Sequence, residues 1–197
     1  MGSISGSIVL GKLKGIDIRN MGSGNAGGTN AFRTVGASFA LGVIFIDILK
    51  GIVSVLFISQ FNLPNHTNLE LITVGCAIAA VLGHIYPIYY KFKGGKGAGT
   101  LIGIIAVLFP VQCILYAISA WIIMLIFTGF VGLSTMIAGV TLSICAYFFN
   151  VPLNYFYFSI AMSFLIIFTH RSNIKRMIKG EENQFKKIMI LNNLFKK

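Results

Sequence analysis

A run of 73 residues without Asp, Glu, Lys or Arg, from Gly97 to Thr169, is the feature that most constrains the fold. A water-soluble domain has about a quarter charged residues and could not cover its surface with such a segment. At about 20 residues per crossing, the run is long enough for three or four membrane helices. The chain of 197 residues, 56% hydrophobic and 11% charged, is therefore predicted to be all-α and polytopic.

The basic residues predict the orientation of the chain. Apart from Lys50, all of them lie within 12–33, 91–96 or 171–197. Short loops rich in Lys and Arg stay on the cytoplasmic side. The three stretches share that side only if the charge-free run crosses an even number of times. Four crossings fit if the helix over 98–109 is short, since it spans about 18 Å of a hydrocarbon core about 30 Å thick.

We therefore predict an integral membrane protein with seven transmembrane helices, its N-terminus outside and its C-terminus in the cytoplasm. Residues 1–197 form a single membrane domain. The first helix is too short for a full crossing, so either it begins inside the bilayer or the natural chain has residues before Met1. The predicted spans are 1–13, 35–60, 69–90, 98–109, 110–128, 132–149 and 153–170.

The C-terminal tail, 172–197, is basic and amphipathic. Its apolar residues recur near helical spacing, as in an interfacial helix attracted to anionic membrane lipids. They are Ile174, Met177, Ile178, Phe185, Ile188 and Met189. The cysteines lie inside apolar runs and the histidines show no metal-ligand spacing, so we predict no disulfide, no metal and no cofactor. Because the basic residues are local, we also predict no nucleic-acid partner.

The first basic loop, 14–34, is suited to binding phosphate. Gly22-x-Gly24-x-x-Gly27 matches the dinucleotide fingerprint, but no strand precedes it and that interpretation is excluded. Glycine N–H groups, short polar side chains and an arginine fork all suit phosphate oxygens. The alternative is a glycine-rich turn between helices. The candidate ligands are Ser23, Gly24, Asn25, Gly27, Thr29, Asn30 and Arg33.

The second basic loop, 87–98, has glycines among its lysines. It is not a P-loop, because Gly97 rather than Ser or Thr follows Lys96. Glycines allow close backbone approach to an anion just before a helix N-terminus near Ala98. The alternative, positive-inside anchoring, explains the lysines but not the glycines. The candidates are Lys93, Gly94, Gly95, Lys96 and Gly97, while His84 is expected to be a helix-end histidine satisfied by backbone.

A third segment, 170–182, follows the last span. His170 and Asn173 are three residues apart and share a helix face, so both can reach a substrate hydroxyl at the membrane surface. Histidine is suited to proton transfer near neutral pH, although an interfacial histidine beside arginines is an equal alternative. Glu181 is expected to pair with a loop lysine or with Arg33 in a structural role.

Asp47 and Lys50 lie inside the second span at positions i and i+3. This spacing allows them to neutralise each other on one helix face. Charges inside a membrane are often functional, but a local pair is more often structural, so we interpret these two residues as a brace.

Together with the segment Asp47-Ile-Leu-Lys-Gly51, the three loops resemble the bacterial acyl-phosphate:glycerol-3-phosphate acyltransferases, the PlsY family. The likeness extends from about Gly2 to Glu182. It implies seven helices, motifs on the cytoplasmic face of the bacterial inner membrane, and transfer of a fatty acyl group from acyl phosphate to the 1-hydroxyl of sn-glycerol 3-phosphate. Lysophosphatidic acid and phosphate would form, as the first acylation step of phospholipid biosynthesis. A soluble acyl-phosphate synthase would be a functional partner.

The resemblance and the residue chemistry give one hypothesis for the site. The catalytic residues would be Ser23, Arg33, Lys96, His170 and Asn173, with the first loop on a phosphate and the developing charge. Lys96 and its glycines would hold glycerol 3-phosphate. The proton would go to His170 or to the donor's own phosphate. The alternative function is a membrane transporter of an organic or phosphate anion, although the repeated halves of many transporters are missing.

Overall fold

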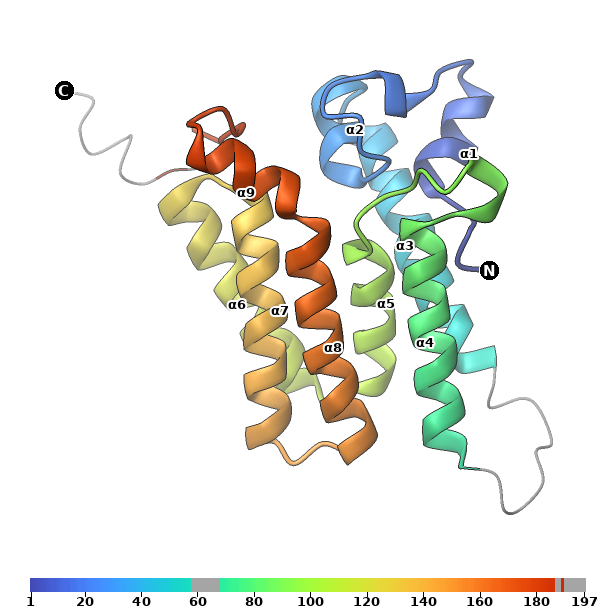
Figure 1. Cartoon of the computed structure of the whole chain (residues 1–197), viewed down its shortest axis with the longest axis vertical. Helices are drawn as coiled ribbons and strands as arrows, with labels where there is room; N and C mark the ends of the chain where they lie inside the picture. Colours follow the sequence, from blue (N-terminus) through green and yellow to red (C-terminus); the bar gives the residue numbers. More distant parts are fainter. Residues whose placement is uncertain (58–67, 187–188, 190–197) are drawn as a thin grey trace. The chain divides into compact units, whose positions relative to one another are not determined.

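The structure, a computed structural model, describes residues 1–57, 68–186 and 189. The regular structure of these residues is helical, which confirms the predicted all-α class (Figure 1). The chain falls into two compact units, Met1–Leu108 and Phe109–Lys197, and each is described by itself.

Unit 1 is organised around one long helix, α3, which contacts α1, α2, α4 and α5. Its helices are α1 (Gly6–Leu13), η1 (Ile18–Asn20), α2 (Gly28–Thr34), α3 (Ala37–Leu56), α4 (Leu69–Ile85), η3 (Ile88–Tyr90) and α5 (Ala98–Leu108). Pro87 limits α4, because a residue before proline is driven away from helical backbone angles, and Tyr86 has φ −120° and ψ 65°. The second motif loop begins at this break.

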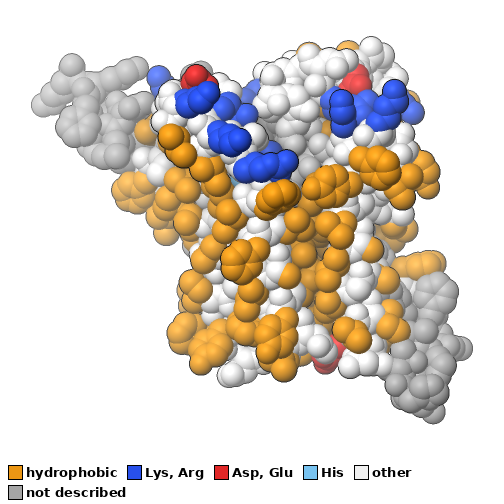
Figure 2. Space-filling view, in the orientation of Figure 1, with side chains coloured by type: hydrophobic (Ala, Val, Ile, Leu, Met, Phe, Trp, Pro, Cys, Tyr) orange, Lys and Arg blue, Asp and Glu red, His pale blue; other side chains and the backbone are white. Residues whose placement is uncertain are grey.

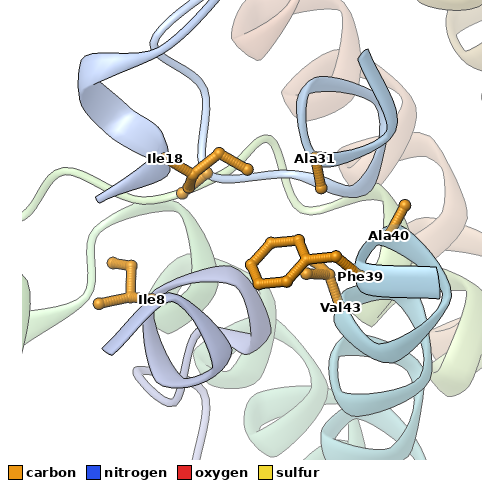
Figure 3. Close-up of a cluster of buried hydrophobic side chains, with 7 residues drawn as sticks. Ile8, Ile18, Ala31, Phe39, Ala40 and Val43 are labelled. Carbon is orange, nitrogen blue, oxygen red and sulfur yellow. The ribbon is translucent and has the colours of Figure 1, made fainter. Parts of the chain in front are cut away.

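A hydrophobic cluster fixes the first motif loop against α1 and α3. Ile8, Ile18, Ala31 and Phe39 are each at most 5% exposed and come from α1, η1, α2 and α3. Figure 3 shows these side chains gathered with Val43 of α3. Burying an aliphatic or aromatic side chain stabilises a fold by about 1.5–3 kcal/mol. The apolar side chains of the loop therefore fix it against α1 and α3, and its polar groups lie outside this cluster.

Helices α3 and α5 approach each other through glycines. A Cβ atom on Gly51 would overlap the carbonyl oxygen of Thr100, and one on Gly103 would overlap the carbonyl oxygen of Ile48. Small residues at a helix interface allow close backbone packing, which is the main source of helix association in a membrane. This contact fixes α5, and with it the end of the second motif loop, against α3.

Unit 2 is a bundle in which α7 contacts α6, α8 and α9. Its helices are α6 (Val111–Thr128), α7 (Val131–Phe148), α8 (Leu153–Thr169) and α9 (Arg171–Ile178). A polar seam joins α7 to α8, where Ser163 Oγ lies 2.8 Å from Ser143 Oγ and donates to Gly139 O at 2.6 Å. Such interhelical hydrogen bonds hold helices together where water is excluded.

The predicted spans correspond to α1 and α3–α8, with differences at the ends. The first is shorter than predicted, since α1 begins at Gly6, and the third ends at Ile85 before the 3-10 turn of η3. α3 ends at Leu56, and residues 58–60 of its predicted span lie outside the described residues. Pro110 and Pro152 immediately precede α6 and α8. Proline fits there because the first N–H groups of a helix need no intrahelical acceptor.

Four helical segments in the described part of the chain are long and apolar enough to cross a membrane: α3, α6, α7, and α4 continued through η3. α8 and α9 pass the same test together as a pair bent by 50°, and α5 is a shorter apolar helix. Within each unit, Figure 2 shows Lys and Arg side chains at one end and hydrophobic side chains along the helices. Phe45 and Phe164, 65% and 69% exposed, illustrate the apolar surface of each unit.

The tail is not the long helix predicted from its apolar spacing. α9 ends at Ile178, and Gly180 turns the chain with φ 72°. The next residues are not helical, and Phe185 N–H donates to Gly129 O at the α6–α7 turn. The helical prediction is therefore wrong from 181 to 186, because the backbone finds partners on the bundle. Ile188, also part of that prediction, lies outside the described residues.

The close contact of α3 with α5 gives a prediction about stability. We expect Gly103→Ala to destabilise the protein by about 1–3 kcal/mol, because the added methyl group meets backbone that cannot move away cheaply. Gly75→Ala in α4 is the matched control, since no atom lies within 4 Å of its added Cβ. Thermal unfolding of the detergent-solubilised proteins measures both. Equal melting temperatures for the two variants would contradict the glycine contact.

Candidate active site

The first motif loop is organised by Asn30, which is 3% exposed. Its Nδ2 donates to the carbonyl oxygens of Ile18, Met21 and Asn25 at 3.2, 2.9 and 3.0 Å, and its Oδ1 accepts from Ser23 N–H at 2.9 Å. The two N–H groups of the amide are thus taken up by the loop itself. The side chain of Asn30 therefore shapes the loop, and its contact with phosphate stays a prediction.

The other predicted ligands of this loop lie at or near the surface. Ser23, Gly24 and Arg33 are exposed, and Asn25, Gly27 and Thr29 are half-buried. Gly24 adopts φ 71°, which favours glycine, and its N–H donates to Met21 O at 3.0 Å. Gly27 directly precedes helix α2, so Thr29 and Arg33 lie on a helix that the sequence pattern did not predict.

Arg19 connects the first motif loop to the second, a role that sequence reasoning missed. Its guanidinium donates to both carboxylate oxygens of Asp17, and Nη1 donates to Tyr90 O at 3.1 Å. Hydrogen bonding to Arg19 lowers the pKa of Asp17 from its usual value of 3.8. The stability contributed by this pair is thus present above pH 3.8 and is lost as the pH falls through the lowered pKa.

The glycines of the second motif loop face α4. Gly94 N–H donates to Ile85 O at 3.2 Å, and Gly95 N–H donates to His84 O at 3.1 Å. A Cβ on either glycine would overlap His84, its carbonyl oxygen for Gly94 and its Nε2 for Gly95. These two N–H groups thus bond to the end of α4, and an approach of phosphate to Gly94 and Gly95 stays a prediction.

The two predicted lysines of this loop differ in exposure. Lys93 is exposed and Lys96 is half-buried. Gly97 has φ 90° just before α5, and a Cβ there would lie 2.9 Å from Val81 Cγ1. Close packing on α4 therefore holds the loop on both sides of Lys96.

The predicted pair of Asp47 and Lys50 forms, and it includes more partners than the sequence suggested. Lys50 Nζ lies 3.1 Å from Asp47 Oδ1 and 2.7 Å from His84 Nδ1. The same groups hold the start of α1, because Lys50 donates to Ile4 O at 2.6 Å and Gly6 N–H donates to Asp47 at 3.2 Å. His84 is therefore satisfied by side chains rather than by backbone, contrary to our expectation.

In unit 2, His170 and Asn173 lie at the junction of α8 with α9 and are 5% and 7% exposed. His170 Nδ1 lies 2.8 Å from Ile166 O. A carbonyl oxygen only accepts, so Nδ1 carries the proton and a neutral ring has its lone pair on Nε2. Asn173 packs against Gly132 of α7, where a Cβ would lie 3.0 Å from its side chain.

Glu182, not Glu181, is the acidic partner in this segment. Glu182 accepts from Asn173 Nδ2 at 2.8 Å and from Arg176 Nε at 2.6 Å, and its side chain is 3% exposed. The Glu181 side chain is exposed, and its pairing with a loop lysine or Arg33 stays a prediction. The turn at Gly180 directs the second of the two acids inward, which helical spacing alone does not reveal.

The predicted residues thus form two groups in the structure. Unit 1 brings the two glycine loops together through Arg19, and unit 2 brings together His170, Asn173 and Glu182. Among residues 1–57, 68–186 and 189, no three His, Cys, Asp or Glu side chains form a candidate metal site.

Comparison with known proteins identifies the class. Residues 1–180 match the glycerol-3-phosphate acyltransferase family. Glycerol-3-phosphate acyltransferases of Aquifex aeolicus and Halalkalibacterium halodurans are 34% and 38% identical, over 94% and 93% of this chain and 94% and 90% of their own. The chain therefore belongs to the glycerol-3-phosphate acyltransferase family.

Two crystal structures are similar to this chain. Both are of PlsY, an integral membrane glycerol 3-phosphate acyltransferase, in a glycerol 3-phosphate form and a lysophosphatidic acid form. They have TM-scores of 0.83 and 0.81 and identities of 34% and 32%. Each covers 99% of this chain, with 94% and 93% of the other chain matched. The protein is thus an integral membrane enzyme whose chain crosses the membrane more than once.

The contacts of Glu182 give a prediction with a built-in control. We expect Glu182→Ala to lower thermal stability by about 1–3 kcal/mol and to reduce activity, because it leaves the buried Asn173 amide and the Arg176 guanidinium without their carboxylate. Glu181→Ala should resemble the wild-type protein in both measurements. If the two variants were affected equally, the inward position of Glu182 would be refuted.

Proposed function

We propose that the protein transfers a fatty acyl group from an acyl phosphate to the 1-hydroxyl of sn-glycerol 3-phosphate. The products are lysophosphatidic acid and phosphate. The observation that carries the proposal is the joined pair of basic glycine loops in unit 1, linked from Arg19 to Tyr90 O, in a chain of this family. Both substrates carry phosphate, and the loops offer cations beside helices with apolar surfaces.

The first loop binds a substrate phosphate and stabilises charge on the reacting acyl group. Ser23 and Arg33 are its catalytic residues, and their exposed side chains support this role. Asn25 and Thr29 add polar contacts, while Gly24 and Gly27 leave room for close approach. Donors held in place before the reaction stabilise developing charge at little reorganisation cost. Asn30 contributes indirectly, since it fixes the backbone at Ser23.

The second loop binds glycerol 3-phosphate through the ammonium groups of Lys96 and Lys93. Lys96 is followed by Gly97 and the first turn of α5, where backbone N–H groups also favour an anion. Gly94 and Gly95 serve this site by fastening the loop to α4, because their N–H groups already have acceptors there.

His170 and Asn173 orient the attacking hydroxyl group. The hydroxyl oxygen bonds to the acyl carbon, the bond from that carbon to the phosphate oxygen breaks, and phosphate leaves with both electrons of that bond. The hydroxyl proton goes to Nε2 of His170, a role that the Nδ1 contact with Ile166 O supports. Acyl phosphate is already activated, so the demand on this base is small. A soluble acyl-phosphate synthase must supply the donor.

We further propose that α1 and α3–α8 are seven transmembrane helices of a bacterial cytoplasmic membrane, with the N-terminus outside and the motif loops on the cytoplasmic face. The basic clusters support this orientation. In a variant without native cysteines, Lys91→Cys should react with an impermeant maleimide only in inverted vesicles, and Asn68→Cys only in right-side-out vesicles. The opposite labelling pattern would reverse the proposed orientation.

The proposed reaction is tested by phosphate release from palmitoyl phosphate by the purified protein, with and without glycerol 3-phosphate. We expect release to depend on glycerol 3-phosphate and to match the formation of lysophosphatidic acid. Palmitoyl-CoA serves as the control donor and should give no product. If a folded, monodisperse sample releases no phosphate, the acyltransferase proposal fails and anion transport becomes the better hypothesis.

A His170→Ala variant is the control for the residue assignment in the same assay. Loss of a positioned acid–base group lowers turnover by about 10²–10⁴-fold. Near-normal turnover by a folded variant would remove His170 from the mechanism without affecting the identity of the reaction.

A further inference from the structure

Three buried polar residues of unit 1 take no direct part in the proposed chemistry. Asp47 and Lys50 lie one turn apart on α3, His84 lies in the last turn of α4, and they are 3%, 4% and 2% exposed. Charged groups inside a membrane protein are costly and are retained where they have a task. His84 lies beside the second motif loop, which indicates that the task of these residues concerns that loop.

Lys50 and Asp47 together hold the ring of His84. The Lys50 ammonium group has three N–H donors, and its close partners include Ile4 O at 2.6 Å, Asp47 Oδ1 at 3.1 Å and His84 Nδ1 at 2.7 Å. His84 Nδ1 also lies 3.5 Å from Asp47 Oδ1. Both charged groups therefore contact the Nδ1 edge of the ring and fix its orientation.

The second motif loop packs against the Nε2 edge of the His84 ring. A Cβ on Gly95 would overlap Nε2 and would lie 2.9 Å from Cε1 and 3.1 Å from Cδ2 of His84. The Gly95 N–H also donates to the His84 carbonyl oxygen at 3.1 Å. His84 therefore contacts the loop through both its side chain and its backbone, at the residue directly before Lys96.

We propose that His84, oriented by Asp47 and Lys50, is the positioning residue of the second motif loop and sets the affinity of Lys96 for the phosphate of glycerol 3-phosphate. The inference rests on the proposed function, in which Lys96 binds that phosphate. His84 does not touch the substrate in this scheme. It acts through the backbone at Gly95. A small displacement there moves Lys96 away from the phosphate, and displacements of about 1 Å already lower affinity and rate.

The two contacts of His84 can be separated by mutation. In His84→Asn, the amide oxygen replaces Nδ1 as an acceptor for Lys50, but the edge facing Gly95 is gone. Gly95→Ala keeps His84 and its Lys50 partner, but adds a methyl group against the ring. In the double variant, the methyl group occupies space that the ring has left. The two substitutions therefore change the same contact from opposite sides.

The test is steady-state kinetics of acyl transfer at saturating palmitoyl phosphate and varied glycerol 3-phosphate. We expect each single variant to raise KM for glycerol 3-phosphate about tenfold, with kcat and KM for palmitoyl phosphate little changed. The double variant should have a KM no higher than the worse single variant, because residues in contact do not contribute independently. Lys96→Ala gives the KM of a loop without its cation, and Gly75→Ala should behave as wild type.

Several outcomes would overturn the inference. One is an unchanged KM for glycerol 3-phosphate in folded His84→Asn, and another is a double variant whose KM increase is the product of the single increases. If His84→Asn does not fold, Gly95→Ala decides, because it preserves the partners of Lys50. An unchanged KM there also overturns the inference. Absence of transfer by the wild-type protein would overturn the proposed function, and this inference with it.

Discussion

The buried interaction of Lys50 with Asp47 and His84 is the constraint around which unit 1 is arranged. A charge on a membrane helix needs partners, and here they come from the start of α1, from α3 and from α4. The Asp47 carboxylate also lies at the first N–H of α1, where negative charge is favoured by the helix dipole. One cluster thus fixes where three helices meet, and the two motif loops extend from those helices.

Other polar side chains of the protein also form hydrogen bonds that stabilise the fold. Asn30 holds the first loop, Arg19 joins it to the second, and Glu182 holds Asn173. Glycines in the second loop allow backbone to approach α4 rather than opening space for an anion. Several residues of the motifs therefore have structural partners within the fold.

Much of the helical architecture is predictable from the sequence, because it follows from local rules. The charge-free run, Pro110 and Pro152 locate helices in unit 2 to within a residue or two. The pairing of Asp47 with Lys50 follows from helical spacing. The contacts of His84 with Lys50 join segments far apart in sequence, and the inward position of Glu182 depends on the turn at Gly180. A glycine pattern predicts a close approach of the backbone, but it does not identify the segment or ligand that it approaches.

The attachment of Gly94 and Gly95 to α4 has a consequence for how the second loop can vary. The last carbonyl groups of a helix lack intrahelical partners, and the His84 and Ile85 carbonyls obtain theirs from these two glycines. The loop is therefore the C-terminal cap of α4, with donors nine and eleven residues further along the chain. A change of length between Ile85 and Gly94 would displace this cap. A change in this segment would therefore alter the end of α4 and the position of Lys96 together, so the proposed phosphate site depends on how a helix ends.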